Sequence, residues 1–111
     1  MTPRKSRLIQ GNLDVLILRS LIEGPSHGYG IARGVHVATD GARVVEDRAL
    51  YIALHRLEER GWLVASWGAS ENNRRARYYR LSASGRRALA RKQRDWAALA
   101  TAMFKALGGK P

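Results

Sequence analysis

Hydrophobic and polar positions along this chain follow two different periods. Four segments carry apolar residues at spacings of three and four, which is typical of helices, and two short segments are rich in aromatic and β-branched residues, which is typical of strands. The predicted helices span Leu8 to Ile22, His27 to Val37, Asp47 to Arg60 and Ala83 to Leu107, and the predicted strands span Trp62 to Trp67 and Ala76 to Leu81. The pattern therefore predicts a mainly α fold with a small β-hairpin.

The first two predicted helices differ in how much of their surface is apolar. In the first, the apolar positions cover well over half of a helical wheel: Leu13, Val15, Leu16, Ile17, Leu18, Leu21 and Ile22. A chain this short has few helices to surround such a surface, so we expect a second subunit to contact it, the alternative being the central helix of a monomeric core. The second helix is expected to bury a narrower side: Tyr29, Ile31, Val35 and Ala38.

Capping residues set the expected bounds of the helices. Ser26 follows a Gly-Pro break and is expected to cap the second helix, and Glu46 or Asp47 the third. Gly61 ends the third helix as a C′ glycine, and Ser82 caps the last helix. Residues 1–7 are polar and are expected to form a mobile arm.

The third predicted helix has one core face and one face free for a partner. Leu50, Leu54 and Leu57 share a narrow stripe. The opposite half carries Arg48, Tyr51, Ile52, His55, Arg56 and Glu59. Cationic and hydrogen-bonding side chains on an exposed helix suit base edges and phosphates in a major groove, although an ordinary solvated helix shows the same pattern.

The order of the elements indicates how such a helix would be used. The two predicted strands are separated by a polar, basic segment that ends in Arg74 and Arg75, so they form a hairpin with a basic tip. Three helices followed by such a hairpin is the order of a winged helix-turn-helix, in which the third helix enters the major groove and the wing contacts adjacent backbone or minor groove. Here these are helix 47–60 and wing 68–77.

The last predicted helix carries an apolar seam along its length: Leu89, Trp96, Leu99, Met103 and Leu107. The seam is too short for a stable coiled coil of its own, so we expect it to pack against the first helix of a partner subunit. The chain accordingly divides into a DNA-binding part, residues 1–82, and a C-terminal dimerisation helix with its tail, residues 83–111.

Charge narrows the choice of partner. The chain has 20 Lys and Arg against 9 Asp and Glu, a net charge of +11, which attracts nucleic acid or an anionic membrane. Between Asn72 and Arg94 there are nine basic residues and no acidic one, and a smaller basic group, Arg4, Lys5 and Arg7, lies near the N-terminus. Phosphate contacts from these segments would be strongly salt-dependent.

Other classes of function find little support in the residues. Cysteine is absent, which excludes disulfides and thiolate chemistry, and the carboxylates do not pair at spacings that suggest an enzyme or a metal site. We therefore expect neither a catalytic function nor a cofactor. No apolar run approaches the roughly 20 residues of a membrane span or resembles a signal peptide. We expect a cytoplasmic, nucleoid-associated protein without stable membrane association.

The ordered motifs closely resemble the PadR family of bacterial transcriptional regulators, in particular short members with one helix after the winged helix. The resemblance covers about Leu8 to Leu107. Its carriers are Gln10 to Leu18, His27 to Ile31, Leu50 to Trp62, Trp67 and Arg74 to Gly85. It implies a homodimeric repressor that dimerises through its first and last helices and binds a dyad-symmetric operator.

The chain departs from the family pattern where DNA would be read. Family members usually have Gly-Ser-Leu-Tyr-Pro-Ala-Leu, whereas this chain has Arg48-Ala-Leu-Tyr-Ile52-Ala-Leu. Arg48 adds a charge where a phosphate would lie, while Ala49 lacks the hydroxyl that a serine would offer to DNA. We expect affinity to survive and the preferred operator to shift.

Two sets of candidate residues follow. The predicted DNA contacts are Arg48, Tyr51, Ile52, His55 and Arg56 on the third helix, Arg74, Arg75 and Arg77 on the wing, and Lys5 and Tyr29. In this assignment Arg56 meets guanine or phosphate and Ile52 meets a thymine methyl; the alternative for the wing arginines is that they only solubilise the hairpin. The predicted dimer contacts are Leu13, Leu16, Ile17, Leu89, Trp96, Leu99, Met103 and Leu107.

Trp96 has a second candidate role. Some members of the family bind flat aromatic ligands between dimer-related tryptophans, so the resemblance implies a site for a small planar aromatic effector at Trp96. A packing tryptophan in a dimer core is the alternative. For the whole protein, the competing functions are a basic nucleic-acid-binding protein without sequence preference and a module that binds membrane surfaces through the last helix.

Overall fold

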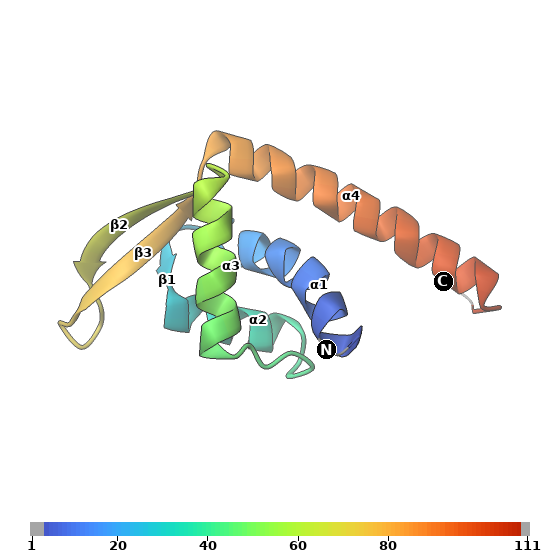
Figure 1. The fold of residues 1–111 in the computed structure, drawn as a ribbon, viewed down its shortest axis with the longest axis horizontal. Helices are drawn as coiled ribbons and strands as arrows, with labels where there is room; N and C mark the ends of the chain where they lie inside the picture. The colour runs from blue at the N-terminus through green and yellow to red at the C-terminus, as the bar shows by residue number, and fades with distance from the viewer. Residues whose placement is uncertain (1–3, 110–111) are drawn as a thin grey trace.

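A computed structural model describes the backbone of residues 4–109 and the side chains of residues 12–109. Figure 1 shows a compact group of helices, a hairpin that projects to one side and a long last helix that runs past the body. The elements are α1 (Arg4–Ser20), β1 (Ser26–His27), α2 (Gly28–Ala38), α3 (Asp47–Glu59), β2 (Leu63–Ala69), β3 (Arg75–Leu81) and α4 (Ala83–Ala106). The mainly α fold with a β-hairpin is confirmed. Helix α1 begins at Arg4, so the expected mobile arm is wrong for residues 4–7.

Helix α1 lies at the centre of the fold and packs against α2, α3 and α4. Of the apolar positions between residues 13 and 22, Leu13, Ile17, Leu18 and Leu21 are buried, the last just after the helix ends, and the others are half-buried: Val15, Leu16 and Ile22. The broad apolar surface of α1 is therefore largely covered within one chain, which fits the central-helix alternative and weakens the argument for a second subunit at this helix.

The start of α2 differs from the expectation because a short strand precedes it. Ser26 pairs with Tyr79 of β3 and is not the cap. His27 takes that position, and its Nδ1 accepts a hydrogen bond of 3.1 Å from the Gly30 N–H. Ile31 and Val35 are buried as expected, but Tyr29 and Ala38 are exposed. Tyr29 lies two residues, about 200°, from Ile31 on the helix, so both cannot face the core.

Helix α3 has the predicted core stripe and the predicted end. Leu50, Leu54 and Leu57 are buried, together with Ala53. At the C-terminus the N–H groups of Gly61 and Trp62 donate to the carbonyls of Glu58 and Leu57, which is a Schellman motif with Gly61 at a positive φ of 77°. Glu46 occupies the N-cap position, but its side chain makes no capping hydrogen bond.

The sheet has three antiparallel strands in the order β1-β3-β2, because β1 adds to the predicted hairpin. Leu63 is paired with Leu81 at one end of the hairpin, and Ala69 with Arg75 at the other. The tight connection between them is closed by hydrogen bonds at Ser70, with Asn73 at a φ of 58°. Tyr79 of β3 is buried against the body of the fold.

One side of helix α4 is buried against the body near its start and exposed further along. Ser82 caps it by accepting a hydrogen bond from the Gly85 N–H, as predicted, and Gly85, Ala88 and Leu89 are buried against the body. Towards its C-terminus the helix runs past the body (Figure 1), and the same stripe continues as exposed apolar residues. They include Trp96, Leu99 and Met103.

Candidate nucleic-acid interface

The free face of α3 presents both cations and apolar side chains to the surroundings. Arg48, Tyr51, Ile52 and His55 are exposed, with 54% of Ile52 accessible. His55 Nε2 lies 2.6 Å from Glu59 Oε1, one turn further along the helix. This mixed face can donate to phosphates and base edges and can also contact a thymine methyl.

Tyr29 and Tyr51 belong to neighbouring parts of this surface. A Cβ added to Gly28 would lie 3.1 Å from Tyr51 Oη, so the Tyr51 ring packs directly on the start of α2. Tyr29 is the next residue along the chain and is largely exposed. The start of α2 and the exposed face of α3 thus form one continuous surface.

The wing holds its cations around an exposed tryptophan. Arg75 Cζ lies 4.4 Å from the centroid of the Trp67 ring and Arg77 Cζ lies 5.8 Å from it. Arg77 also donates to Glu58 Oε2 of α3 at 2.8 Å, which fastens the wing to the helix. Arg74 and Arg75 have no carboxylate partner among the described residues, so they are the wing cations that remain available to an anion.

Tyr79 lies beneath the junction of wing and helix. Burial raises the pKa of its phenol above the usual value, and the positive charge of Arg77 opposes this effect only in part. Tyr79 therefore stays neutral here and serves packing.

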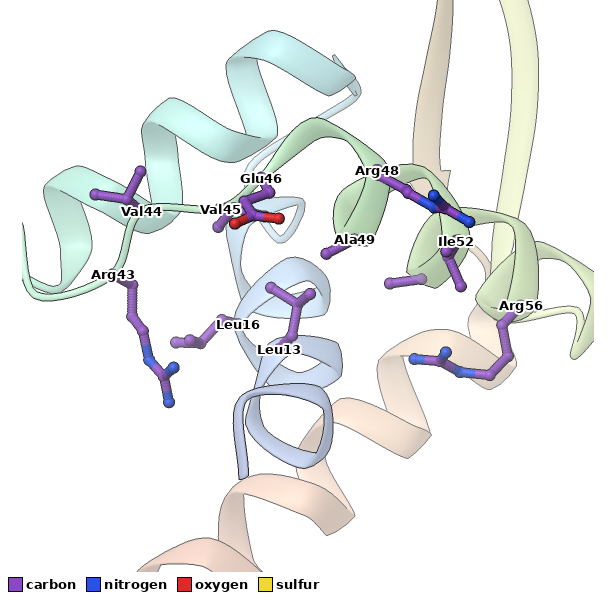
Figure 2. Close-up of a pocket in the computed structure, with 11 residues that line it drawn as sticks. Leu13, Leu16, Arg43, Val44, Val45, Glu46, Arg48, Ala49, Ile52 and Arg56 are labelled. Atoms are coloured by element: carbon purple, nitrogen blue, oxygen red, sulfur yellow. The ribbon is translucent and has the colours of Figure 1, made fainter. Parts of the chain in front are cut away.

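A groove of about 290 Å³ lies on the other flank of α3, between this helix, α1 and the α2–α3 connection. Figure 2 shows Leu13 and Leu16 of α1 on one side of it and Arg48 and Ile52 of α3 on the other. The Arg56 side chain also lines the groove and binds the carboxylate of Asp14 on α1. The DNA contact predicted for Arg56 remains a prediction, but its guanidinium is directed to α1.

The predicted dimer residues fall into two groups. Leu13, Ile17 and Leu89 are buried in the core of the chain itself, so a contact with a partner does not fit these three. Leu16 is half-buried, whereas the other four are exposed on α4: Trp96, Leu99, Met103 and Leu107. Phe104, absent from the predicted set, is exposed beside them. Trp96 Nε1 donates to Asn12 Oδ1 at 3.0 Å. The contact predicted for Lys5 lies outside the described side chains.

Two kinds of feature are absent from the described part of the chain. Among those residues no helix is both long enough and apolar enough to cross a membrane. Nor do the side chains described there include three or more His, Asp or Glu grouped as metal ligands.

Three helices followed by a wing, with the exposed face of the third helix carrying Arg48, Ile52 and His55, define a winged helix-turn-helix DNA-binding protein. The model of the transcriptional regulator PadR-like family matches residues 17–91. The chain belongs to the PadR-like family of transcriptional regulators, and it is therefore a DNA-binding regulator.

Solved structures of transcriptional regulators agree with this assignment, and the chain is also similar to an uncharacterised curated protein. The chain is 33% identical to a transcriptional regulator from Clostridium thermocellum, with a TM-score of 0.80 and coverage of 89% of this chain and 96% of that one. It is 26% identical to a PadR family transcription regulator from Clostridium difficile, with a TM-score of 0.74 and coverage of 86% and 97%. It is also 29% identical over 93 residues to a protein from Lysinibacillus sphaericus, which covers 84% of this chain and 85% of that protein.

Sequence reasoning missed the ion pairs that organise this surface. Asp14 is the only charged residue in an apolar run from Leu13 to Leu18, and a lone carboxylate in such a run was a signal that it has a buried partner. Arg56 lies 42 residues away, so no local pattern could identify it. The same holds for Glu58 and Arg77 across the wing.

Proposed function

We propose that this regulator is a homodimeric repressor that binds a dyad-symmetric operator in a sequence-specific manner. In each subunit α3 enters the major groove, and wing residues 68–77 follow the adjacent backbone or minor groove. The observation that carries the proposal is the free face of α3, where Arg48, Ile52 and His55 stand exposed beside Tyr51 and Tyr29. A face that combines cations with apolar groups is suited to contacts with base edges, whereas contacts with phosphates alone would require only cations.

The homodimer is supported by α4. Its buried residues Gly85, Ala88 and Leu89 are followed on the same side by Trp96, which is half-exposed and contacts Asn12, and then by Leu99 and Met103, which are exposed. A contiguous row of large apolar residues on a projecting helix marks an interaction site. A second copy of the chain carries an identical row, so two α4 helices related by two-fold symmetry can bury each other's apolar residues.

Selection of bound sequences from a random duplex pool at near-physiological salt tests the proposed function. An enriched motif with two-fold symmetry is expected, and its half-sites should be about one helical turn or a multiple apart. Binding without enrichment would instead support a basic protein without sequence preference. If no duplex is retained, both readings fail, and binding to anionic vesicles becomes the next measurement.

Neutralising the wing is expected to change the salt dependence of DNA binding. The Arg74→Gln/Arg75→Gln protein should lose about two units from the slope of log K against log salt, because each phosphate contact contributes roughly 0.9. Arg19→Gln/Lys105→Gln, which removes two exposed cations that lie outside both basic segments, is the matched control and should leave the slope nearly unchanged. Equal slopes for the wing variant and the unmodified protein would remove the wing from the interface.

A planar aromatic effector is expected to bind at Trp96 between the two subunits and to release the operator. The support is the half-exposed indole on the apolar stripe of α4, held at its N–H by Asn12. A planar cationic or phenolic compound should change the tryptophan fluorescence of the unmodified protein and not that of Trp96→Phe. The same change in both proteins would place the compound at Trp62 or Trp67 instead.

A further inference from the structure

Arg56 lies on the recognition helix but on the flank that faces α1. Taking 100° per residue, it is about 90° from the centre of the exposed face formed by Arg48, Tyr51, Ile52 and His55, on the side of Ala49. Its Nη2 donates to Asp14 Oδ1, and its side chain is only 35% exposed. Asp14 itself is 11% exposed at the side chain, between the buried Leu13 and the half-buried Val15 of α1.

We propose that Asp14 and Arg56 form an internal ion pair that positions the recognition helix on α1, and that Arg56 is not a DNA contact. Asp14 and Arg56 are then positioning residues: they fix where Arg48, Ile52 and His55 stand relative to the wing. The inference rests on the proposed function, because it concerns how that surface is presented to an operator.

Arg56 stays with Asp14 because of the energetic cost of leaving the Asp14 carboxylate without a partner. Asp14 accepts a hydrogen bond only from Arg56 among the side chains described, so movement of the guanidinium to a phosphate would leave a nearly buried charge without a partner. Breaking such a pair is strongly destabilising, because the desolvated charge that remains has lost its compensation. If Arg56 moved to DNA, the complex would gain one phosphate contact, which exposed cations already provide. In exchange, the Asp14 carboxylate would lose its partner.

The charges on the helix agree with this assignment. Arg48 is exposed and forms no ion pair in the described part of the chain, so its charge is free to meet a phosphate. The charge of Arg56 is cancelled by Asp14. The pair therefore contributes little to the field that DNA meets, although it joins α3 to the central helix.

Four variants separate the two roles of Arg56: Asp14→Leu, Arg56→Met, the double variant, and Arg48→Met as the matched control on the same helix. Arg56→Met is expected to weaken operator binding at least tenfold, because Asp14 loses its partner. The double variant should recover affinity to within about threefold of the unmodified protein, with an unchanged salt slope, since no net charge is lost. Asp14→Leu frees Arg56 and should raise the slope by about one unit while reducing the ratio of operator to random-sequence affinity.

The same variants give a different result if Arg56 contacts DNA. Were Arg56 a phosphate or base contact, the double variant would bind as weakly as Arg56→Met and its slope would fall by about one unit, as the slope of Arg48→Met is expected to do. That outcome would overturn the proposal.

Unfolding without DNA tests the pair independently of the proposed function. In a double-mutant cycle, the two single substitutions together should lower the melting temperature by clearly more than the double variant does. Additive shifts would show that the residues do not interact and would overturn the proposal. If the unmodified protein enriches no operator while the cycle shows coupling, the proposed function fails and the ion pair stands.

Discussion

Leu99→Glu combined with Met103→Glu is expected to convert the protein to a monomer and to lower its affinity for an operator by at least about a hundredfold. Two carboxylates on the exposed stripe of α4 would face two others across the two-fold axis, without the apolar burial that offsets the entropy of association. A monomer engages one half-site, so the gain of roughly 10² to 10⁴ from linking two binding units disappears.

Sedimentation equilibrium and operator titration measure the two effects on the same samples. Ala98→Glu/Thr101→Glu is the matched control, because it adds two carboxylates to exposed positions on the other side of α4. The control should remain dimeric and bind as before. A Leu99→Glu/Met103→Glu protein that sediments as a dimer would show that the stripe of α4 is not the interface.

Gly85→Ala is expected to destabilise the fold by about 3 kcal/mol, near the upper end for one added methyl group in a packed site. An alanine Cβ would lie 2.1 Å from the carbonyl oxygen of Trp62, which is backbone and cannot rotate away. That carbonyl also accepts the Ser82 N–H, and Ser82 caps α4 through Gly85, so the start of the helix would move as one unit.

Thermal unfolding provides the measurement. A loss of this size corresponds to a melting temperature lower by about 12 °C or more in a domain of about a hundred residues. Gly34→Ala is the matched control: its Cβ would lie 3.7 Å from Ser20 Cβ, an ordinary contact, and alanine favours the helix by up to about 1 kcal/mol. A Gly85→Ala protein that melts with the control would mean that the approach of α4 to Trp62 is not needed for stability.

Local patterns predicted most of the architecture. The leucine stripe of α3, its glycine stop at Gly61 and the Ser82 cap each depend on residues within a few positions, and all three are present in the structure. Strand β1 could not be predicted in this way because two residues show no period. The start of α1 was placed too late, since its first turns carry a polar sequence without an apolar stripe.

For the candidate site, the sequence predicts which residues are exposed but not which of them contact one another. The sequence identified the exposed residues of α3 and the wing cations, but not which cations already have partners, because Asp14 and Glu58 reach Arg56 and Arg77 through tertiary contacts. Helical periodicity also cannot tell whether an apolar face is covered by the same chain or by a second one. For this reason Leu13 and Ile17 were assigned to an interface although they belong to the core.

The central place of α1 has a consequence for how the protein is made. This helix leaves the ribosome before the elements that bury Leu13, Ile17 and Leu18, and of these α4 emerges last. The nascent chain must therefore carry an unprotected apolar helix until α4 has been translated. During this interval, chaperones and aggregation compete with folding.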